Sequence, residues 1–157
     1  MRGPNVMAGY FGNPEATADI LDADGFLHTG DLARVDPTGC LYIVDRLKEL
    51  IKYKGYQVPP AEWEALLLTH PVIADASVIG VPDAEGEEIP KAFVVVQPGE
   101  PLNADEVMEF VTAQVAPSKR VRQVEFIAAI PKSLTGKILR KELRGVSGRA
   151  THSAGHH

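Results

Sequence analysis

The sequence predicts an α/β fold, and two observations carry that prediction. From residue 47 onward, strand-like apolar runs alternate with helical segments, which indicates a compact α/β unit over residues 47–145. The first 44 residues are turn-rich and lack the length and apolar pattern for a core of their own. We therefore expect one α/β unit preceded by an irregular, β-rich segment.

The first 44 residues are predicted to hold a short helix and a hairpin. Asn13 is a suitable N-cap and Pro14 suits the first helical position, so a helix should begin there. Residues 32–44, LARVDPTGCLYIV, place two β-rich stretches around Asp-Pro-Thr-Gly. That arrangement is typical of a hairpin with a type I turn.

Helices and strands of ordinary length are predicted after residue 47. Residues 59–71 read as a helix bounded by prolines, and residues 102–117 as an amphipathic helix with Asn103 and Glu106 in a capping box. A short basic helix is predicted at residues 137–145. Apolar runs of strand length occupy residues 73–82, 91–99 and 121–131. The tail, residues 146–157, is polar and rich in small residues, so we expect disorder there.

Composition excludes several classes of protein. The formal net charge of −5 argues against a general nucleic-acid binder, which needs a basic surface. Cys40 is the only cysteine, so no internal disulfide can form. No apolar run approaches the roughly 20 residues that span a bilayer, and the N-terminus shows no signal-peptide core. We expect a cytoplasmic protein.

The segment Asp45–Gly55, DRLKELIKYKG, gathers four cations in this acidic chain. Periodicity alone also allows a helix here, but Gly55 and the β-rich residues 56–58 favour a strand that ends in a hairpin turn at Tyr53–Tyr56. Such a strand separates its cations from its apolar side chains, with Arg46, Lys48, Lys52 and Lys54 on one face and Leu47, Ile51 and Tyr53 on the other. Taken alone, this window favours an edge strand whose lysines oppose aggregation.

Two further motifs, around Lys137 and Asp31, each allow two interpretations. Lys137 follows Thr-Gly as in a phosphate-binding P-loop, but Pro131 and Ile138 stand where that motif needs Gly and Ser or Thr. The loop either leads into a basic helix or carries a lysine that reaches a phosphate or carboxylate. Asp31, in Thr-Gly-Asp, either caps its own turn, which local grounds favour, or accepts ribose hydroxyls.

The histidines indicate no catalytic or metal site. His28 and His70 stand alone in the sequence and are interpreted as structural. His152, His156 and His157 lie in the polar tail, where an incidental origin is favoured over weak metal binding. We therefore predict no metal ligand in this chain.

Taken in order, four motifs give a specific resemblance. Their sequences are GYFGNPEAT at residues 9–17, DGFLHTGDLARVD at 24–36, GCLYIVDRLKELIKYKGYQVPPAEWEALLLTHP at 39–71, and IPKSLTGKILRKELR at 130–144. Together they resemble the closing motifs of the adenylate-forming enzymes, which include acyl-CoA synthetases, 4-coumarate–CoA ligases, luciferases and carrier-loading domains. The stretch IKYKGYQV, residues 51–58, is most similar to the 4-coumarate–CoA ligase and luciferase branch.

The resemblance implies a division of the chain. Residues 1–45 resemble the end of the β-rich last subdomain of a large N-terminal adenylation domain. Residues 46–48 match a hinge, with Lys48 at the pivot, and residues 49–145 a small C-terminal lid with a short mixed sheet flanked by helices and preceded by a hairpin. Family enzymes rotate this lid between their two reaction steps, which is a rigid-body switch. Residues 146–157 are the tail.

The resemblance also implies the chemistry. A carboxylic acid, fatty or aryl, reacts with ATP to give an acyl-adenylate and pyrophosphate, and a thiol, usually CoA, then displaces AMP. Asp31 resembles the aspartate that holds the ribose hydroxyls, and Arg46 the arginine that contacts the nucleotide. Lys137 resembles the lysine that bridges the carboxylate and the α-phosphate in the first step. For the second step, Lys52, Lys54, Gly55 and Gln57 resemble a hairpin that lines the CoA tunnel.

The remaining expectations concern residues that depart from the family pattern and the partners that the resemblance implies for this chain. Pro59 and Trp63 stand where the family usually has alanine and an aliphatic residue. The phosphate loop, the acyl pocket and the Mg²⁺ site are expected in an N-terminal adenylation domain outside this sequence, so we expect the chain alone to be inactive. A lysine acetyltransferase acting on Lys137 is an implied partner. The alternatives are a luciferase-like or carrier-loading enzyme and a standalone anion-binding module.

Overall fold

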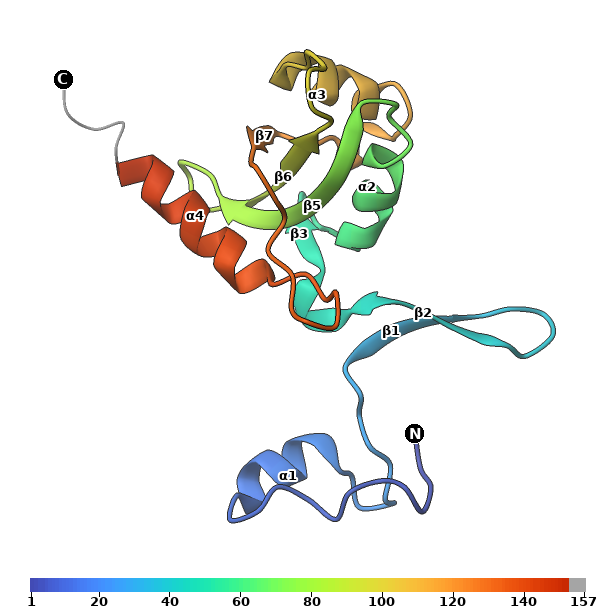
Figure 1. The fold of residues 1–157 in the computed structure, drawn as a ribbon. Coiled ribbons are helices and arrows are strands. Elements are labelled where there is room, and N and C mark those ends of the chain that lie inside the picture. The colour runs from blue at the N-terminus through green and yellow to red at the C-terminus, as the bar shows by residue number, and fades with distance from the viewer. Residues whose placement is uncertain (153–157) are drawn as a thin grey trace. The chain divides into compact units, whose positions relative to one another are not determined.

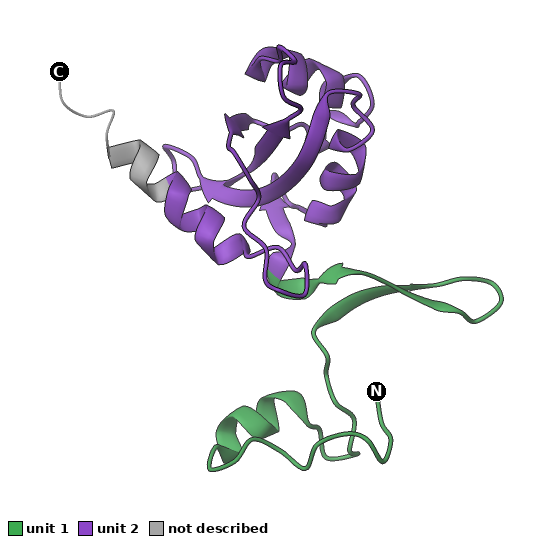
Figure 2. Cartoon of the chain, in the orientation of Figure 1, with its two compact units in different colours: residues 1–48 green, residues 49–157 purple. Residues whose placement is uncertain are grey.

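The computed structural model describes residues 1–152 (Figure 1). The chain divides into two compact units, Met1–Lys48 and the part from Glu49 onward (Figure 2). The helices of the described part include none that is long and apolar enough to cross a membrane. Each unit is described by itself below.

The first unit holds one helix and one hairpin. Helix α1, Pro14–Ile20, begins where predicted, because the Asn13 side chain accepts a hydrogen bond from the Ala16 backbone N–H at 3.0 Å. Strands β1, Asp31–Val35, and β2, Leu41–Arg46, form the predicted antiparallel hairpin. No residue of this unit is buried.

The second unit is built on a mixed sheet in the order β5-β6-β7. Strands β5, Ile73–Pro82, and β6, Glu88–Val96, are antiparallel, and β7, Gln123–Phe126, runs parallel to β6. The hairpin of β3, Ile51–Tyr53, and β4, Tyr56–Val58, precedes the sheet. This confirms the predicted architecture of a hairpin followed by a short mixed sheet.

Helices cover both faces of this sheet (Figure 1). Helices α2, Pro60–Leu67, and α3, Ala104–Thr112, pack with the hairpin against one face, around Trp63, Leu67 and Val107. Helix α4, Arg140–His152, packs on the other face, where Leu143 meets Ile79 and Phe93. The predicted capping box of α3 is present, with Asn103 and Glu106 bonded reciprocally.

The structure corrects two predicted elements. The segment Asp45–Gly55 is not one strand, because the 3-10 turn Leu47–Glu49 separates β2 from β3. The basic helix begins at Arg140 rather than Lys137, because residues 132 and 138 pair as an isolated bridge. It also continues to His152 through the first residues of the predicted disordered tail.

Tertiary contact explains the longer helix. Ser147 is buried and its hydroxyl accepts a hydrogen bond from Lys91 Nζ at 3.1 Å, which holds this part of α4 on the sheet. Such contacts override the weak helix propensity of a sequence with glycine and serine. The rest of the predicted tail, including His156 and His157, lies outside the described residues.

Candidate functional site

The first unit places Asp31 and Arg46 together at one end of its hairpin. They begin β1 and end β2, and they are register partners. Arg46 Nε lies 3.4 Å from Asp31 Oδ1. The arginine side chain is 60% exposed and the aspartate 22%, so the pair faces solvent on one side.

The backbone before Asp31 fixes this pair. Gly30 has φ +70°, a conformation that favours glycine, and its carbonyl accepts a hydrogen bond from the Leu47 N–H at 2.8 Å. A hollow of about 490 Å³ opens beside the pair, and Lys48 also lines it. One carboxylate and two cations suit the hydroxyls and phosphate of a nucleotide. The predicted residues Asp31, Arg46 and Lys48 are therefore brought together.

The β3–β4 hairpin of the second unit turns tightly at Lys54 and Gly55. Both residues have positive φ, 49° and 79°, which is the signature of a type I′ turn. A Cβ added at Gly55 would meet no atom within 4 Å, so backbone conformation rather than crowding requires glycine here. The Lys54 ammonium and the Arg122 guanidinium lie 5.5 and 5.3 Å from the Tyr53 ring centre.

Lys52 and Gln57 face each other across this hairpin and are both exposed. Their neighbours Ile51, Tyr53 and Val58 are buried in the core, so the pleat directs Lys52 and Gln57 to solvent. Glu88 Oε2 accepts a hydrogen bond from the Lys52 backbone N–H at 2.7 Å. The predicted thioester-step residues thus share one rigidly held surface.

Lys137 lies on a small closed loop. Residues 132 and 138 form an antiparallel bridge, and the Ser133 N–H donates to the Lys137 carbonyl at 2.8 Å. Inside the loop, the Ser133 hydroxyl accepts the Lys137 N–H at 3.2 Å, and Gly136 has φ +80°. The Lys137 side chain is exposed and belongs to a segment separate from the hairpin. A lysine presented on a braced loop suits transient contact with an anionic group.

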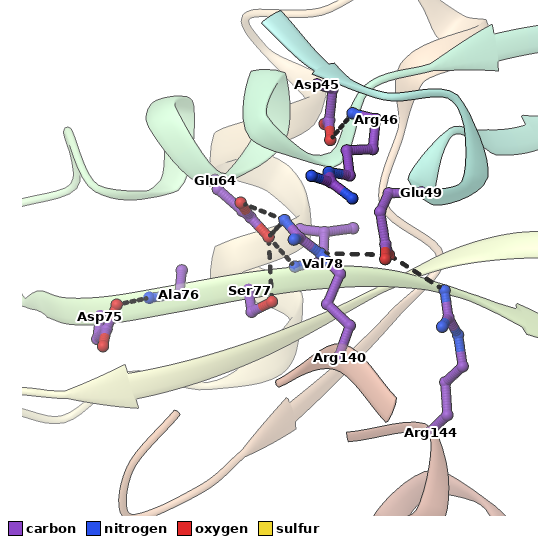
Figure 3. Close-up of polar contacts among 10 residues, drawn as sticks. All are labelled: Asp45, Arg46, Glu49, Glu64, Asp75, Ala76, Ser77, Val78, Arg140 and Arg144. Atoms are coloured by element: carbon purple, nitrogen blue, oxygen red, sulfur yellow. Dashed lines mark hydrogen bonds and ion pairs between the residues drawn. The ribbon is translucent and has the colours of Figure 1, made fainter. Parts of the chain in front are cut away.

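An ion-pair network near this loop was not predicted (Figure 3). One Arg140 nitrogen lies 2.8 and 2.9 Å from the two oxygens of Glu64. Glu64 also accepts hydrogen bonds from the Ser77 hydroxyl and the Val78 N–H, both at 3.0 Å. The two charged side chains are only 14% and 11% exposed, so removing one partner should cost about 3–5 kcal/mol.

The sequence did contain a signal for Glu64. It lies between Trp63 and Leu67 on the face of α2 that is buried, at helical spacing from Pro60. A carboxylate on a buried face requires a partner. Nothing in the sequence identified that partner as Arg140, which is 76 residues away.

The two departures from the family pattern lie at the start of α2. Pro59 occupies the N-cap position without a side-chain hydrogen bond. Trp63 is 1% exposed and its indole N–H donates to the carbonyl of Lys119. Trp63 therefore fastens α2 to the 3-10 turn Pro117–Lys119, a contact that an aliphatic residue cannot make.

His28, His70 and Asp22 have local partners. His28 Nε2 lies 3.2 Å from Asp22, and the His70 ring packs edge-on to Phe110 with 4.7 Å between ring centres. The Phe26 N–H, which Asp22 accepts, lowers the pKa of that carboxyl. Among the described residues, no three His, Cys, Asp or Glu side chains group as metal ligands would.

Comparison with known proteins gives the same assignment for sequence and for fold. A family model described as the AMP-binding enzyme C-terminal domain matches residues 62–137. Peroxisomal OPC-8:0-CoA ligase 1 of Arabidopsis thaliana is 58% identical over 143 residues, which are 91% of this chain and 26% of that protein. 4-Coumarate–CoA ligase-like 4 of Oryza sativa subsp. japonica is 60% identical over 143 residues, with the same coverage of 91% and 26%.

Among solved structures, ATP-bound MatB from Rhodopseudomonas palustris is similar, with a TM-score of 0.87 and 34% sequence identity. The match covers 92% of this chain and 29% of that one. Sequence and fold together identify residues 62–137 as the C-terminal domain of the AMP-binding enzymes, and the structural neighbours of the chain are adenylate-forming enzymes. The chain spans about a quarter of the length of the curated relatives it matches.

Proposed function

We propose that this chain is the C-terminal portion of an ATP-dependent acid–thiol ligase. The ligase activates a fatty or aryl carboxylic acid as acyl-AMP and transfers the acyl group to CoA. One observation carries the proposal. The chain presents an exposed lysine, Lys137, on a hydrogen-bonded loop, and it also holds a hollow lined by Asp31 and Arg46. The printed names of the CoA ligase relatives support CoA as the thiol.

The proposed roles follow from the chemistry of each group. Asp31 accepts the ribose hydroxyls of ATP or AMP, and Arg46 pairs with the same nucleotide. Lys137 neutralises the carboxylate and α-phosphate oxygens as the acyl-adenylate forms, where charge develops in the transition state. A point charge on a flexible stem can be withdrawn afterwards.

For thioester formation we assign a different segment of the second unit, the β3–β4 hairpin. Lys52 and Gln57 offer a cation and an amide on its solvent face, and Lys54 and Gly55 form its tip. The turn at Lys48 is the proposed pivot that exchanges the Lys137 loop for this hairpin. One protein thereby meets two transition states that need different groups.

Residues 1–48 belong, in this proposal, to a larger adenylation domain that also holds the Mg²⁺ site. Two features support this assignment. No residue of the unit is buried, and its two-stranded hairpin exposes large apolar side chains that need a partner surface. These exposed side chains are Val35, Leu41, Tyr42, Ile43 and Val44.

The test compares the isolated chain with a full-length ligase that carries it. We expect the full-length enzyme to release pyrophosphate and form a CoA thioester from 4-coumarate or octanoate, and the isolated 157-residue chain to do neither. Light emission would instead indicate a luciferase-like enzyme, and loading of a carrier protein a carrier-loading domain. Tight anion binding by the isolated chain through Lys52 and Lys54 would favour a standalone binding module.

Two further proposals concern the protein's surroundings. A lysine acetyltransferase that modifies Lys137 would remove the charge that adenylation needs. Mass spectrometry of the protein purified from its own cells tests for that modification.

The predicted cytoplasmic location competes with a peroxisomal one, since one relative is named peroxisomal. Imaging of the tagged full-length protein distinguishes the two compartments.

A further inference from the structure

The loop that presents Lys137 is held by an ion pair on each side, one directly to β5 and one to α2. Before Lys137, the Lys132 ammonium pairs with Asp75. After Lys137, Arg140 pairs with Glu64, whose carboxylate is held by Ser77 and Val78. Lys132 thus contacts β5 directly at Asp75, Arg140 reaches Ser77 and Val78 of β5 through Glu64, and the exposed Lys137 lies between Lys132 and Arg140 in the sequence.

The position of Arg140 indicates that its pairing is specific. It is the first residue of α4, where the helix dipole disfavours a cation. A positive charge at this point is stabilised only because two carboxylates surround it. Glu64 lies at hydrogen-bond distance, and Glu49 Oε2 lies 4.0 Å from Arg140 Nε.

Glu49 extends the network to the start of the second unit. Its carboxylate also lies 3.5 Å from Arg144, one helical turn after Arg140 (Figure 3). Glu49 directly follows the proposed hinge residues 46–48. The same two arginines therefore hold the exit of the Lys137 loop and the point where the chain leaves the hinge.

We propose that Arg140 and Glu64 are positioning residues for Lys137 in adenylation, and that Glu49 ties this clamp to the hinge. The proposal rests on the adenylation role proposed for Lys137. In this proposal Arg140 acts through Lys137, because its ion pair with Glu64 fixes the direction in which the loop presents the lysine. A misplacement of about 1 Å in such a group can lower a rate about 100-fold.

The first test needs no enzymatic activity. In the 157-residue chain, hydrogen exchange of residues 131–139 should be slow in the wild type, because Ser133, Gly136 and Leu139 donate their amides within the loop. We expect Arg140→Met to speed this exchange about tenfold or more. Unchanged exchange in that variant would overturn the proposal.

Lys91→Met is the matched control. Lys91 is also a buried cation, paired with Glu125 at 2.7 Å, and it contacts α4 at Ser147, away from the loop. We expect Lys91→Met to leave exchange of residues 131–139 within about twofold of wild type. Equal acceleration by both variants would show general loosening and contradict the clamp.

The second test uses the full-length ligase and separates the half-reactions. Arg140→Met should lower pyrophosphate release about 10- to 100-fold, but lower the transfer of a supplied 4-coumaroyl- or octanoyl-adenylate to CoA less than about threefold. Arg140→Lys keeps the positive charge but not the guanidinium group and should fall in between. Equal loss of both half-reactions would refute the positioning role, whereas an inactive wild-type enzyme would instead refute the proposed ligase function.

Discussion

At the scale of single residues, Lys137 shows how a weak local motif becomes a specific one. Its Thr-Gly-Lys context fails as a P-loop, and the loop closes through its own backbone rather than around a phosphate. What the structure adds is presentation, with the ammonium exposed and the backbone braced. The proposed role depends on charge, so the variant that tests it should remove charge and keep length.

Lys137→Gln in the full-length ligase should lower the adenylation rate at least about 100-fold, because one preorganised donor to a developing charge is worth that much. Transfer of a supplied acyl-adenylate to CoA should change less than about threefold. Stopped-flow measurement of pyrophosphate release gives the first rate. Lys141→Gln, an exposed lysine on α4, is the control and should change neither rate; a comparable loss in that variant would argue against a specific role for Lys137.

The residue scale also shows where prediction from sequence ends. Asp31, Arg46 and Lys48 were predicted one by one and the structure gathers them around one hollow. Glu64 and Arg140 escaped prediction because their pairing joins two helices through the tertiary fold. A periodic pattern indicates which face is buried, but it does not say which distant side chain meets a charge on that face.

At the scale of elements, the β3–β4 turn combines one residue that suits its backbone and one that does not. Gly55 at φ 79° suits a type I′ turn, whereas Lys54 at φ 49° is a non-glycine residue in a left-handed conformation. Lysine has little intrinsic propensity for that conformation. The hairpin was predicted from Gly55 and its β-rich flanks, but the preceding 3-10 turn was not.

Substitution by alanine should change the stability of the chain in opposite directions at two glycines, because their backbone conformations differ. Gly55→Ala should destabilise the chain by about 1–2 kcal/mol, because alanine resists positive φ. Gly145→Ala, inside α4 with open space around the new Cβ, should stabilise it by about 0.5–1 kcal/mol. Urea unfolding of the 157-residue chain measures both values. Destabilisation by Gly145→Ala would count against the assigned helix, and unchanged or increased stability of Gly55→Ala would count against the assigned turn.

The β1–β2 turn should respond to acid through Asp36. Its carboxylate accepts the Thr38 hydroxyl at 2.6 Å and the Thr38 and Cys40 amides at 2.8 and 3.0 Å. The Thr38 hydroxyl and these amides lower the pKa of Asp36 below its usual 3.8. Because the folded pKa is depressed, the turn is fully stabilised above pH 3.8 and loses this contribution as the pH falls through the folded value.

An NMR titration tests this turn. The Asp36 carboxyl should titrate below 3.8, and the Thr38 and Cys40 amide shifts should change with the same midpoint. In Asp36→Asn, the acid-dependent change of those amide shifts should disappear. A midpoint at or above the ordinary aspartate value would contradict the hydrogen-bonded turn.

At the scale of the whole molecule, the two units differ in whether they contain a hydrophobic core of their own. The second unit has helices on both faces of its sheet and contains all the buried apolar residues of the described chain. The first unit carries the nucleotide-binding candidates without a core. Alternating strands and helices were sufficient to predict the second unit. In the first unit, capping and turn residues predicted the helix and the hairpin, whereas the proposed place of this unit in a larger domain rests on its ordered motifs.

The central claim is that one chain supplies different groups to two successive steps. The most direct measurement compares both half-reactions in the full-length ligase for Lys137→Gln and Lys52→Ala. We predict opposite selectivity: the first variant loses pyrophosphate release and keeps acyl transfer to CoA, and the second keeps pyrophosphate release and loses at least about tenfold in acyl transfer. Parallel loss of both half-reactions in both variants would contradict the division of labour between the Lys137 loop and the β3–β4 hairpin.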